Sequence, residues 1–65
     1  MTSISDDVEY LENLIPEWWK SHDTVLIVGR ILDKQGIISD PWNFMEKPRA
    51  YQSLINDFVS EQRNG

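Results

Sequence analysis

Closely spaced carboxylates are the side chains of this chain most able to do chemistry. Asp6, Glu9, Glu12 and Glu17 lie three to five positions apart, in a stretch that contains no lysine or arginine. Two carboxylates can act together as general acid and general base, but this role requires a cleft that shifts their pKa values. A chain of 65 residues has little volume for such a cleft. We therefore expect no catalytic residue and no enzyme activity.

Metal, thiol and phosphate chemistry also lack their usual residues. The chain has no cysteine and one histidine, His22, which we interpret together with Asp23 as a helix start rather than as a metal-ligand set. Gly29 and Gly36 are not followed by the Lys-Ser or Lys-Thr pair of a phosphate-binding loop. Because glycine weakens a helix, Gly29 is better explained by the close approach of another element, such as a tryptophan ring. We expect no metal and no cofactor.

The charge of the chain is unevenly distributed. Residues 1–17 hold five acids and no base, whereas residues 18–65 hold six of each, so the first quarter carries the whole net charge of −5. This sign disfavours direct binding to nucleic acid, whose phosphates are contacted by lysine and arginine. Two interpretations of the acids stay open. They are a solvated helix start that suits the helix dipole and solubility, or a functional acidic face.

The acids belong to a predicted N-terminal helix, which Ser5 can cap. One face of this helix is apolar, formed by Val8, Leu11, Leu14, Ile15 and Trp18. Asp6, Glu9, Glu12 and Glu17 point away from that face. Pro16 either kinks the helix or begins a second short one through PEWWK, and the sequence leaves both possibilities open.

A central helix is predicted over residues 21–36. Ser21 or Asp23 can cap its start, and Gly36 lies where a left-handed residue ends a helix. The run of β-branched residues makes a strand over 24–31 the alternative, in which case the fold would be α+β.

Two further helices complete the predicted fold. Asp40 and Pro41 begin a short helix that ends before Pro48, and residues 48–62 form an amphipathic helix. The predicted architecture is all-α: one domain over residues 1–65, a small bundle of three long helices and one short helix.

Trp18 and Trp19 are adjacent, so they lie about 100° apart on a helix and cannot both face the core. We expect Trp19 to be partly exposed, either as an edge residue or as a binding anchor of the kind enriched at interface hot spots. A homodimer or larger homo-oligomer that buries Trp19 and serves as a scaffold is one possible consequence.

The segment WWKSHDTVLIVGRILDKQG, residues 18–36, resembles the opening of the Myb/SANT-like module of some chromatin remodellers. The matching positions are Trp18, His22, Asp23, Leu26, Ile27, Gly29 and Gly36. The sequence departs from the module twice, because Gly36 comes about two residues late and Trp42 lies too far beyond it to be the second tryptophan. The resemblance implies a chromatin interaction module whose acidic surface binds a basic histone tail.

The acids near the N-terminus also form a ribbon of negative charge comparable in pitch to a phosphate backbone, which carries one charge per about 3.4 Å. With the length, the absence of cysteine and the apparent native start MTSISDD, this ribbon resembles small acidic inhibitors encoded by phages and mobile elements. Anti-CRISPR and anti-restriction proteins that mimic nucleic acid are examples. The resemblance implies a non-enzymatic inhibitor or adaptor that occupies a basic DNA- or RNA-binding surface.

The expected partner is therefore a basic nucleic-acid-binding protein or complex. The residues predicted to bind it are Asp6, Glu9, Glu12, Glu17 and Trp19. No run of about 18 apolar residues and no basic leader occurs, so we expect no membrane contact and a cytoplasmic location, that of the host cell if the chain is phage-encoded.

Overall fold

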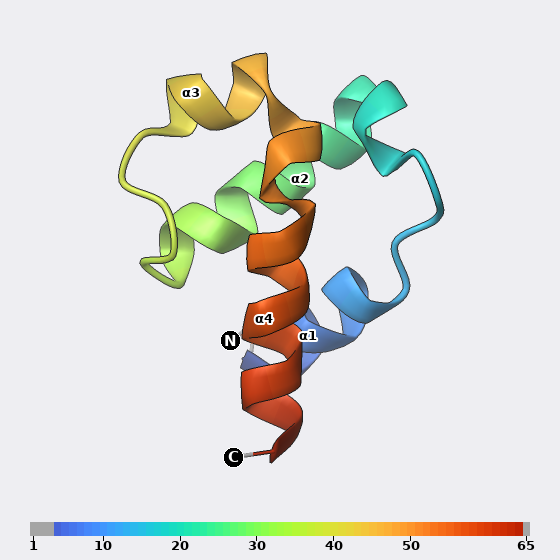
Figure 1. The fold of residues 1–65 in the computed structure, drawn as a ribbon, viewed down its shortest axis with the longest axis vertical. Helices are drawn as coiled ribbons and strands as arrows, with labels where there is room; N and C mark the ends of the chain where they lie inside the picture. The colour runs from blue at the N-terminus through green and yellow to red at the C-terminus, as the bar shows by residue number, and fades with distance from the viewer. Residues whose placement is uncertain (1–3, 65) are drawn as a thin grey trace.

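A computed structural model of the chain describes residues 4–64. The elements, in order, are α1 (Ile4–Glu12), the 3-10 turn η1 (Trp18–Lys20), α2 (His22–Lys34), α3 (Pro41–Glu46), the 3-10 turn η2 (Pro48–Tyr51) and α4 (Gln52–Asn64). The described part of the chain contains no strand, so the all-α prediction is confirmed and the strand alternative over 24–31 is wrong. α4 runs along the long axis, α2 crosses its upper half and α1 crosses its lower half (Figure 1).

The first helix is shorter than predicted. α1 ends at Glu12, after nine residues, and its last turn is closed by Asn13, whose amide Nδ2 donates to the Glu9 carbonyl at 2.8 Å. Ser5 lies inside α1 and is not its N-cap. The prediction of three long helices is therefore overstated, because the apolar periodicity of the sequence continues past the residue at which the helix ends.

Pro16 separates two elements instead of kinking one. It lies in a turn, and the following Glu17 adopts the left-handed conformation, with φ +63°, immediately before η1. Proline disfavours helix at the residue before it, which agrees with the irregular chain over residues 14–15. The second possibility left open by the sequence is therefore observed only in part: a separate short helical element follows, but it begins at Trp18 and not at Pro16.

Local signals place the ends of α2 correctly. Ser21 rather than Asp23 is the N-cap, and its hydroxyl accepts from the backbone N–H of residue 24 at 3.4 Å. Gly36 has φ +73°, and the N–H of Ile37 donates to the carbonyl of Leu32 at 2.9 Å. This is the hydrogen-bond pattern of a glycine-terminated helix, and only a residue without Cβ adopts it cheaply.

The C-terminal half also follows its predicted boundaries. Asp40 Oδ1 accepts from the backbone N–H groups of Trp42 and Asn43 at 3.1 and 3.3 Å, and Pro41 is the first residue of α3. α3 ends before Pro48, as predicted. The amphipathic helix predicted over residues 48–62 begins as η2 and continues as α4, which ends at Asn64, two residues later than predicted.

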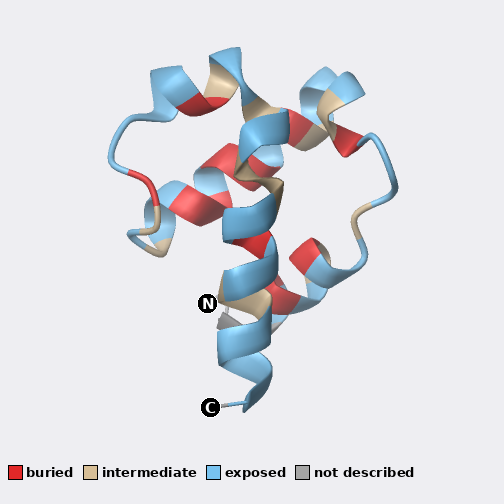
Figure 2. Ribbon diagram, viewed as in Figure 1, coloured by how far each residue is buried: buried red, intermediate tan, exposed pale blue. Residues whose placement is uncertain are grey.

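The buried residues lie on the sides of the helices that face the middle of the molecule (Figure 2), and apolar side chains among them form the core. The buried ones are Val8, Leu11, Trp18, Val25, Val28, Ile31, Leu32, Ile38, Phe44 and Ile55. Phe44 stacks on Trp18 with ring centroids 6.2 Å apart and meets Tyr51 edge-on at 5.1 Å. A Cβ at Gly29 would lie 3.1 Å from Phe44, so the aromatic ring that approaches this glycine is phenylalanine rather than the tryptophan suggested above.

Candidate functional site

The four predicted binding carboxylates do not form one uncompensated ribbon. Glu17 lies outside α1, and its carboxylate is 3.0 Å from Nζ of Lys20. Glu12 pairs with Arg63, which α4 brings back to the end of α1. The stretch that holds the four acids contains no lysine or arginine, but Lys20 and Arg63 reach two of them from outside it. The sequence could not reveal the second pair, because its partners meet only through the packing of α1 on α4.

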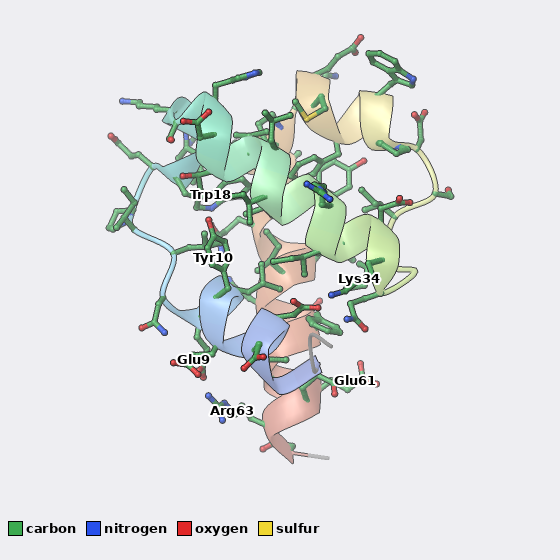
Figure 3. All side chains as sticks on the ribbon, turned by 180° about the vertical axis from the view of Figure 1, so that it is seen from behind. Glu9, Tyr10, Trp18, Lys34, Glu61 and Arg63 are labelled. Carbon is green, nitrogen blue, oxygen red and sulfur yellow. The ribbon has the colours of Figure 1, made fainter. Side chains whose placement is uncertain are left out.

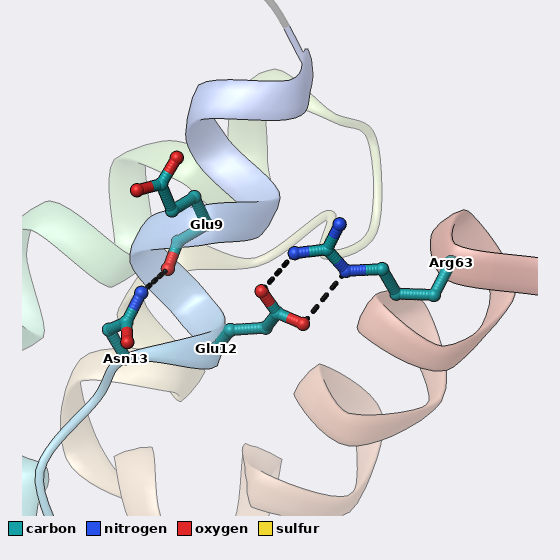
Figure 4. A network of polar contacts seen from close by, with 4 residues as sticks. All are labelled: Glu9, Glu12, Asn13 and Arg63. Atoms are coloured by element: carbon teal, nitrogen blue, oxygen red, sulfur yellow. Dashed lines mark hydrogen bonds and ion pairs between the residues drawn. The ribbon is translucent and has the colours of Figure 1, made fainter.

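The contact between Glu12 and Arg63 is two-pronged (Figure 4). Arg63 Nε donates to one carboxylate oxygen at 2.8 Å, and Nη2 donates to the other. These hydrogen bonds, together with charge attraction, hold the pKa of Glu12 below its usual value and raise that of Arg63, whose charge is also favoured by nearby Glu9. The pair fixes the C-terminal end of α1 against α4.

Asp7 has a structural position and is only 4% exposed. Its Oδ2 lies 2.8 Å from Nζ of Lys34 and accepts a hydrogen bond of the same length from Nε2 of Gln35. The hydrogen bond from Lys34, supported by that from Gln35, lowers the pKa of Asp7 despite the opposing effect of burial. This carboxylate ties α1 to the end of α2, where Lys34 also suits the helix dipole.

Asp6 and Glu9 lie elsewhere, on a groove between α1 and the start of α2. The groove has a volume of about 540 Å³ and is lined by Asp6, Glu9, Tyr10, Asn13, Leu14, Ile15 and Thr24. Tyr10 lies between the two helices (Figure 3). Within residues 4–64, no lysine or arginine lines this groove. We call it the α1–α2 groove.

Ile15 is a member of this groove that the sequence analysis assigned to the core. Its side chain is 64% exposed, because α1 ends at Glu12 and Ile15 falls in the connector instead of on the buried face of a helix. The signal that could have identified it is Pro16, since a residue before proline is disfavoured in a helix.

Trp19 is not part of the groove. Trp18 is 1% exposed and Trp19 is half-buried, so the predicted division of the two rings is confirmed. The Trp19 ring meets Trp18 edge-on, at a centroid separation of 5.8 Å, and the Arg49 guanidinium lies 5.7 Å from its centroid. These contacts hold Trp19 beside η2, apart from Asp6 and Glu9, so the structure does not bring the five predicted binding residues together.

Trp42 is the exposed aromatic that the sequence analysis missed. It is 81% exposed, whereas Phe44, two positions later on the short helix α3, is fully buried. Residues two apart on a helix point about 200° from each other, so the burial of one implies the exposure of the other. Which of the two faces the core is decided by the packing of α3 on α2.

The remaining side chains offer little for metal chemistry. His22 is exposed at the first residue of α2. In the part of the chain that the structure describes, no three histidine, cysteine, aspartate or glutamate side chains are grouped to hold a metal ion. No helix within residues 4–64 combines the length and apolar character needed to cross a membrane.

The chain matches no protein-family model, no curated protein and no solved structure. The resemblances to the Myb/SANT-like module and to small acidic inhibitors therefore stay predictions from the sequence.

Proposed function

We propose that the chain is a non-enzymatic adaptor or inhibitor that takes a basic segment of a partner protein into the α1–α2 groove. The observation that carries the proposal is the combination of surfaces in this groove. Two carboxylates, Asp6 and Glu9, line a concave surface together with the half-buried Tyr10 and the exposed Ile15, with no base among its described lining residues. An apolar groove between two helices suits a short helix that inserts one or two aliphatic side chains.

Charge complementarity favours a basic partner. The packed helices α1 and α4 carry six acids and one base, a net charge of −5, whereas residues 18–51 carry four acids and five bases. Ion pairing of Glu12 with Arg63 redistributes this charge but does not change its sum. A cationic segment would therefore be attracted to this end of the molecule, and electrostatic steering would speed its arrival.

Mimicry of nucleic acid is a stricter form of the same proposal. It requires a row of carboxylates at phosphate spacing, and the pairing of Glu12 with Arg63 and of Glu17 with Lys20 interrupts that row at two of its four positions. A basic histone tail could occupy the same groove. A competition experiment with DNA or RNA separates an inhibitor from an adaptor. An inhibitor displaces the nucleic acid from the partner protein, whereas an adaptor leaves the nucleic acid bound.

The test uses a synthetic amphipathic helical peptide in which lysines flank a leucine stripe. Two control peptides replace lysine with glutamate or scramble the stripe at constant composition. We expect only the first to bind, to shift the NMR signals of Tyr10 and Ile15, and to bind more weakly as salt rises. The double variant Asp6→Asn/Glu9→Gln is expected to lose about five- to tenfold in affinity.

The matched control is Asp57→Asn/Glu61→Gln, which removes the same charge from α4. Glu61 lies on the opposite side of α4 from Arg63 and Glu9 (Figure 3), so this variant should keep its affinity within about twofold. An equal loss of peptide affinity in both double variants would show that binding depends only on net charge, and it would overturn the proposal of the α1–α2 groove. Binding of the glutamate peptide in preference to the lysine peptide would overturn it as well.

A further inference from the structure

A second apolar groove lies on the opposite side of α2, between α2 and α3. It has a volume of about 320 Å³, and Leu26, Pro41, Trp42 and Met45 form its apolar surface. Trp42 is 81% exposed and Leu26 is 42% exposed. A buried aromatic side chain removes about 150–250 Å² of surface from water. Trp42 therefore leaves more apolar surface in water than any of the other large hydrophobic residues exposed in the described part of the chain. We call this surface the Trp42 face.

The Trp42 face has one positive and one negative side chain. Arg30 and Asp33 lie one turn apart on α2 and both line the groove. No hydrogen bond or ion pair joins either side chain to another of the described residues. The face is therefore apolar and electrically neutral, with its two opposite charges separated along the helix.

We propose that the Trp42 face binds a second copy of this chain through a two-fold axis. A two-fold interface uses the same patch on both subunits, so the patch must be complementary to itself. An axis that passes across α2 between Arg30 and Asp33 brings Arg30 of each copy opposite Asp33 of the other. A strongly acidic or strongly basic partner would find no net charge here, in contrast to the α1–α2 groove.

The backbone that carries Trp42 is held in place, which suits a docking residue. Asp40 caps the N–H of Trp42 itself, Asn43 Nδ2 donates to the Tyr51 hydroxyl at 2.7 Å, and Phe44 is fully buried. Because this backbone is fixed and an indole has only two side-chain torsions, Trp42 loses little conformational entropy on binding. In the symmetric pair, each Trp42 ring covers the aliphatic surface of Leu26 and Met45 in the other copy.

The size of the face sets the strength of the association. The chain has an accessible surface of 4699 Å², and a stable dimer of standard size buries about 800 Å² per partner. The Trp42 face has eight lining residues, whereas an interface of that size uses about 20–30 residues per partner. We therefore expect a weak and reversible dimer, with a Kd on the order of 0.1 mM. This surface differs from the predicted one, which involved Trp19, a half-buried ring that packs against Trp18 and Arg49.

A charge-exchange experiment on the full chain tests the proposal. Sedimentation equilibrium from about 10 μM to 1 mM is expected to show dimerisation of the unaltered chain. The variants Arg30→Asp and Asp33→Arg place like charges opposite each other in a symmetric pair, so each alone should dimerise at least tenfold more weakly. An equimolar mixture of the two should regain association as a heterodimer, because one variant presents two acids and the other two bases.

Two apolar variants complete the design. Trp42→Ala should be monomeric throughout this range, while Ile15→Ala, an exposed apolar residue of the α1–α2 groove, should dimerise like the unaltered chain. Circular dichroism confirms that each variant is folded, and an exposed Trp42 makes its replacement structurally mild. A monomeric unaltered chain at 1 mM, undiminished dimerisation of Trp42→Ala, or a charge-variant mixture that stays monomeric would each overturn the proposal. The variant Asp6→Asn/Glu9→Gln should dimerise normally, which separates this proposal from the α1–α2 groove.

Discussion

Arg63 in the last turn of α4 forms a two-pronged ion pair with Glu12 at the end of α1, across 51 positions of the sequence. α1 is a helix of nine residues, which is too short to be stable alone in water. Its position therefore depends on tertiary contacts: Val8 and Leu11 in the core, Asp7 on Lys34 at one end and Glu12 on Arg63 at the other.

Removing the Glu12–Arg63 pair is expected to loosen the ends of these helices without unfolding the protein. In Arg63→Gln and in Glu12→Gln, amide hydrogen exchange in the last turn of α4 should become several-fold faster. Global stability should change little, because exposed ion pairs contribute weakly. Exchange measured by NMR at low salt provides the readout, and raising the salt should bring the unaltered chain closer to the variants.

The charge-reversed double variant, Glu12→Arg with Arg63→Glu, is the matched control. It keeps the pair with its polarity exchanged, so it should recover most of the protection in the last turn. Equal exchange rates in the unaltered chain and in both single variants would show that the pair does not hold the two helices together.

The pairing of Asp7 with Lys34 and Gln35 predicts a loss of stability in acid. The pKa of Asp7 is held below its ordinary value of 3.8, so between these two values the unfolded chain binds more protons than the folded one. Its contribution to stability is therefore complete above the unfolded pKa and is lost as the pH falls through the folded pKa. Glu12 has a lowered pKa too, and its contribution changes in the same direction below its ordinary value of 4.5.

Asp7→Asn is expected to lower the free energy of unfolding by about 1–3 kcal/mol at pH 7. The loss should shrink as the pH falls below about 4, because Asp7 of the unfolded chain is then protonated and Asp7 of the folded chain follows at still lower pH. Urea denaturation at several pH values between about 3 and 7 measures both effects. Asp57→Asn, at an exposed position of α4, should keep the pH dependence of the unaltered chain, and a constant difference between Asp7→Asn and the unaltered chain at all pH values would contradict the prediction.

Helix ends were predictable where their signals are local. Ser21 and Gly36 bracket α2, and Asp40 begins α3, through hydrogen bonds that span at most five positions of the sequence. The same type of reasoning overextended α1, because the apolar positions that follow it belong to a different element. Trp18 is buried as predicted, but it reaches the core from η1 rather than from the N-terminal helix.

The candidate site was less predictable, since charges are neutralised by tertiary packing. The acid series is visible in the sequence, yet nothing in it shows that α4 ends beside Glu12 or that Lys34 turns toward Asp7. Exposure of Trp42 and Ile15 depends similarly on where short elements pack. The groove that retains Asp6 and Glu9 follows from the arrangement of two helices, which composition and periodicity do not specify.

Gly29→Ala is expected to destabilise the protein by about 1 kcal/mol, although alanine favours helices. Helix propensity alone would contribute a gain of about 1 kcal/mol. The added methyl would, however, lie 3.1 and 3.2 Å from two ring carbons of Phe44. Phe44 is fully buried between Trp18 and Tyr51 and has little room to move, and overpacking of this kind costs about 1–3 kcal/mol.

Replacing Phe44 with a smaller side chain is expected to reverse the effect of Gly29→Ala on stability. In a Phe44→Leu background the contact is relieved, so Gly29→Ala should stabilise that variant by up to about 1 kcal/mol through helix propensity. Denaturation of the four proteins in this double-mutant cycle measures the coupling between the two positions, which should be about 1–2 kcal/mol. The same effect of Gly29→Ala in both backgrounds would mean that Phe44 does not restrict this position and that close packing is not the reason for a glycine inside α2.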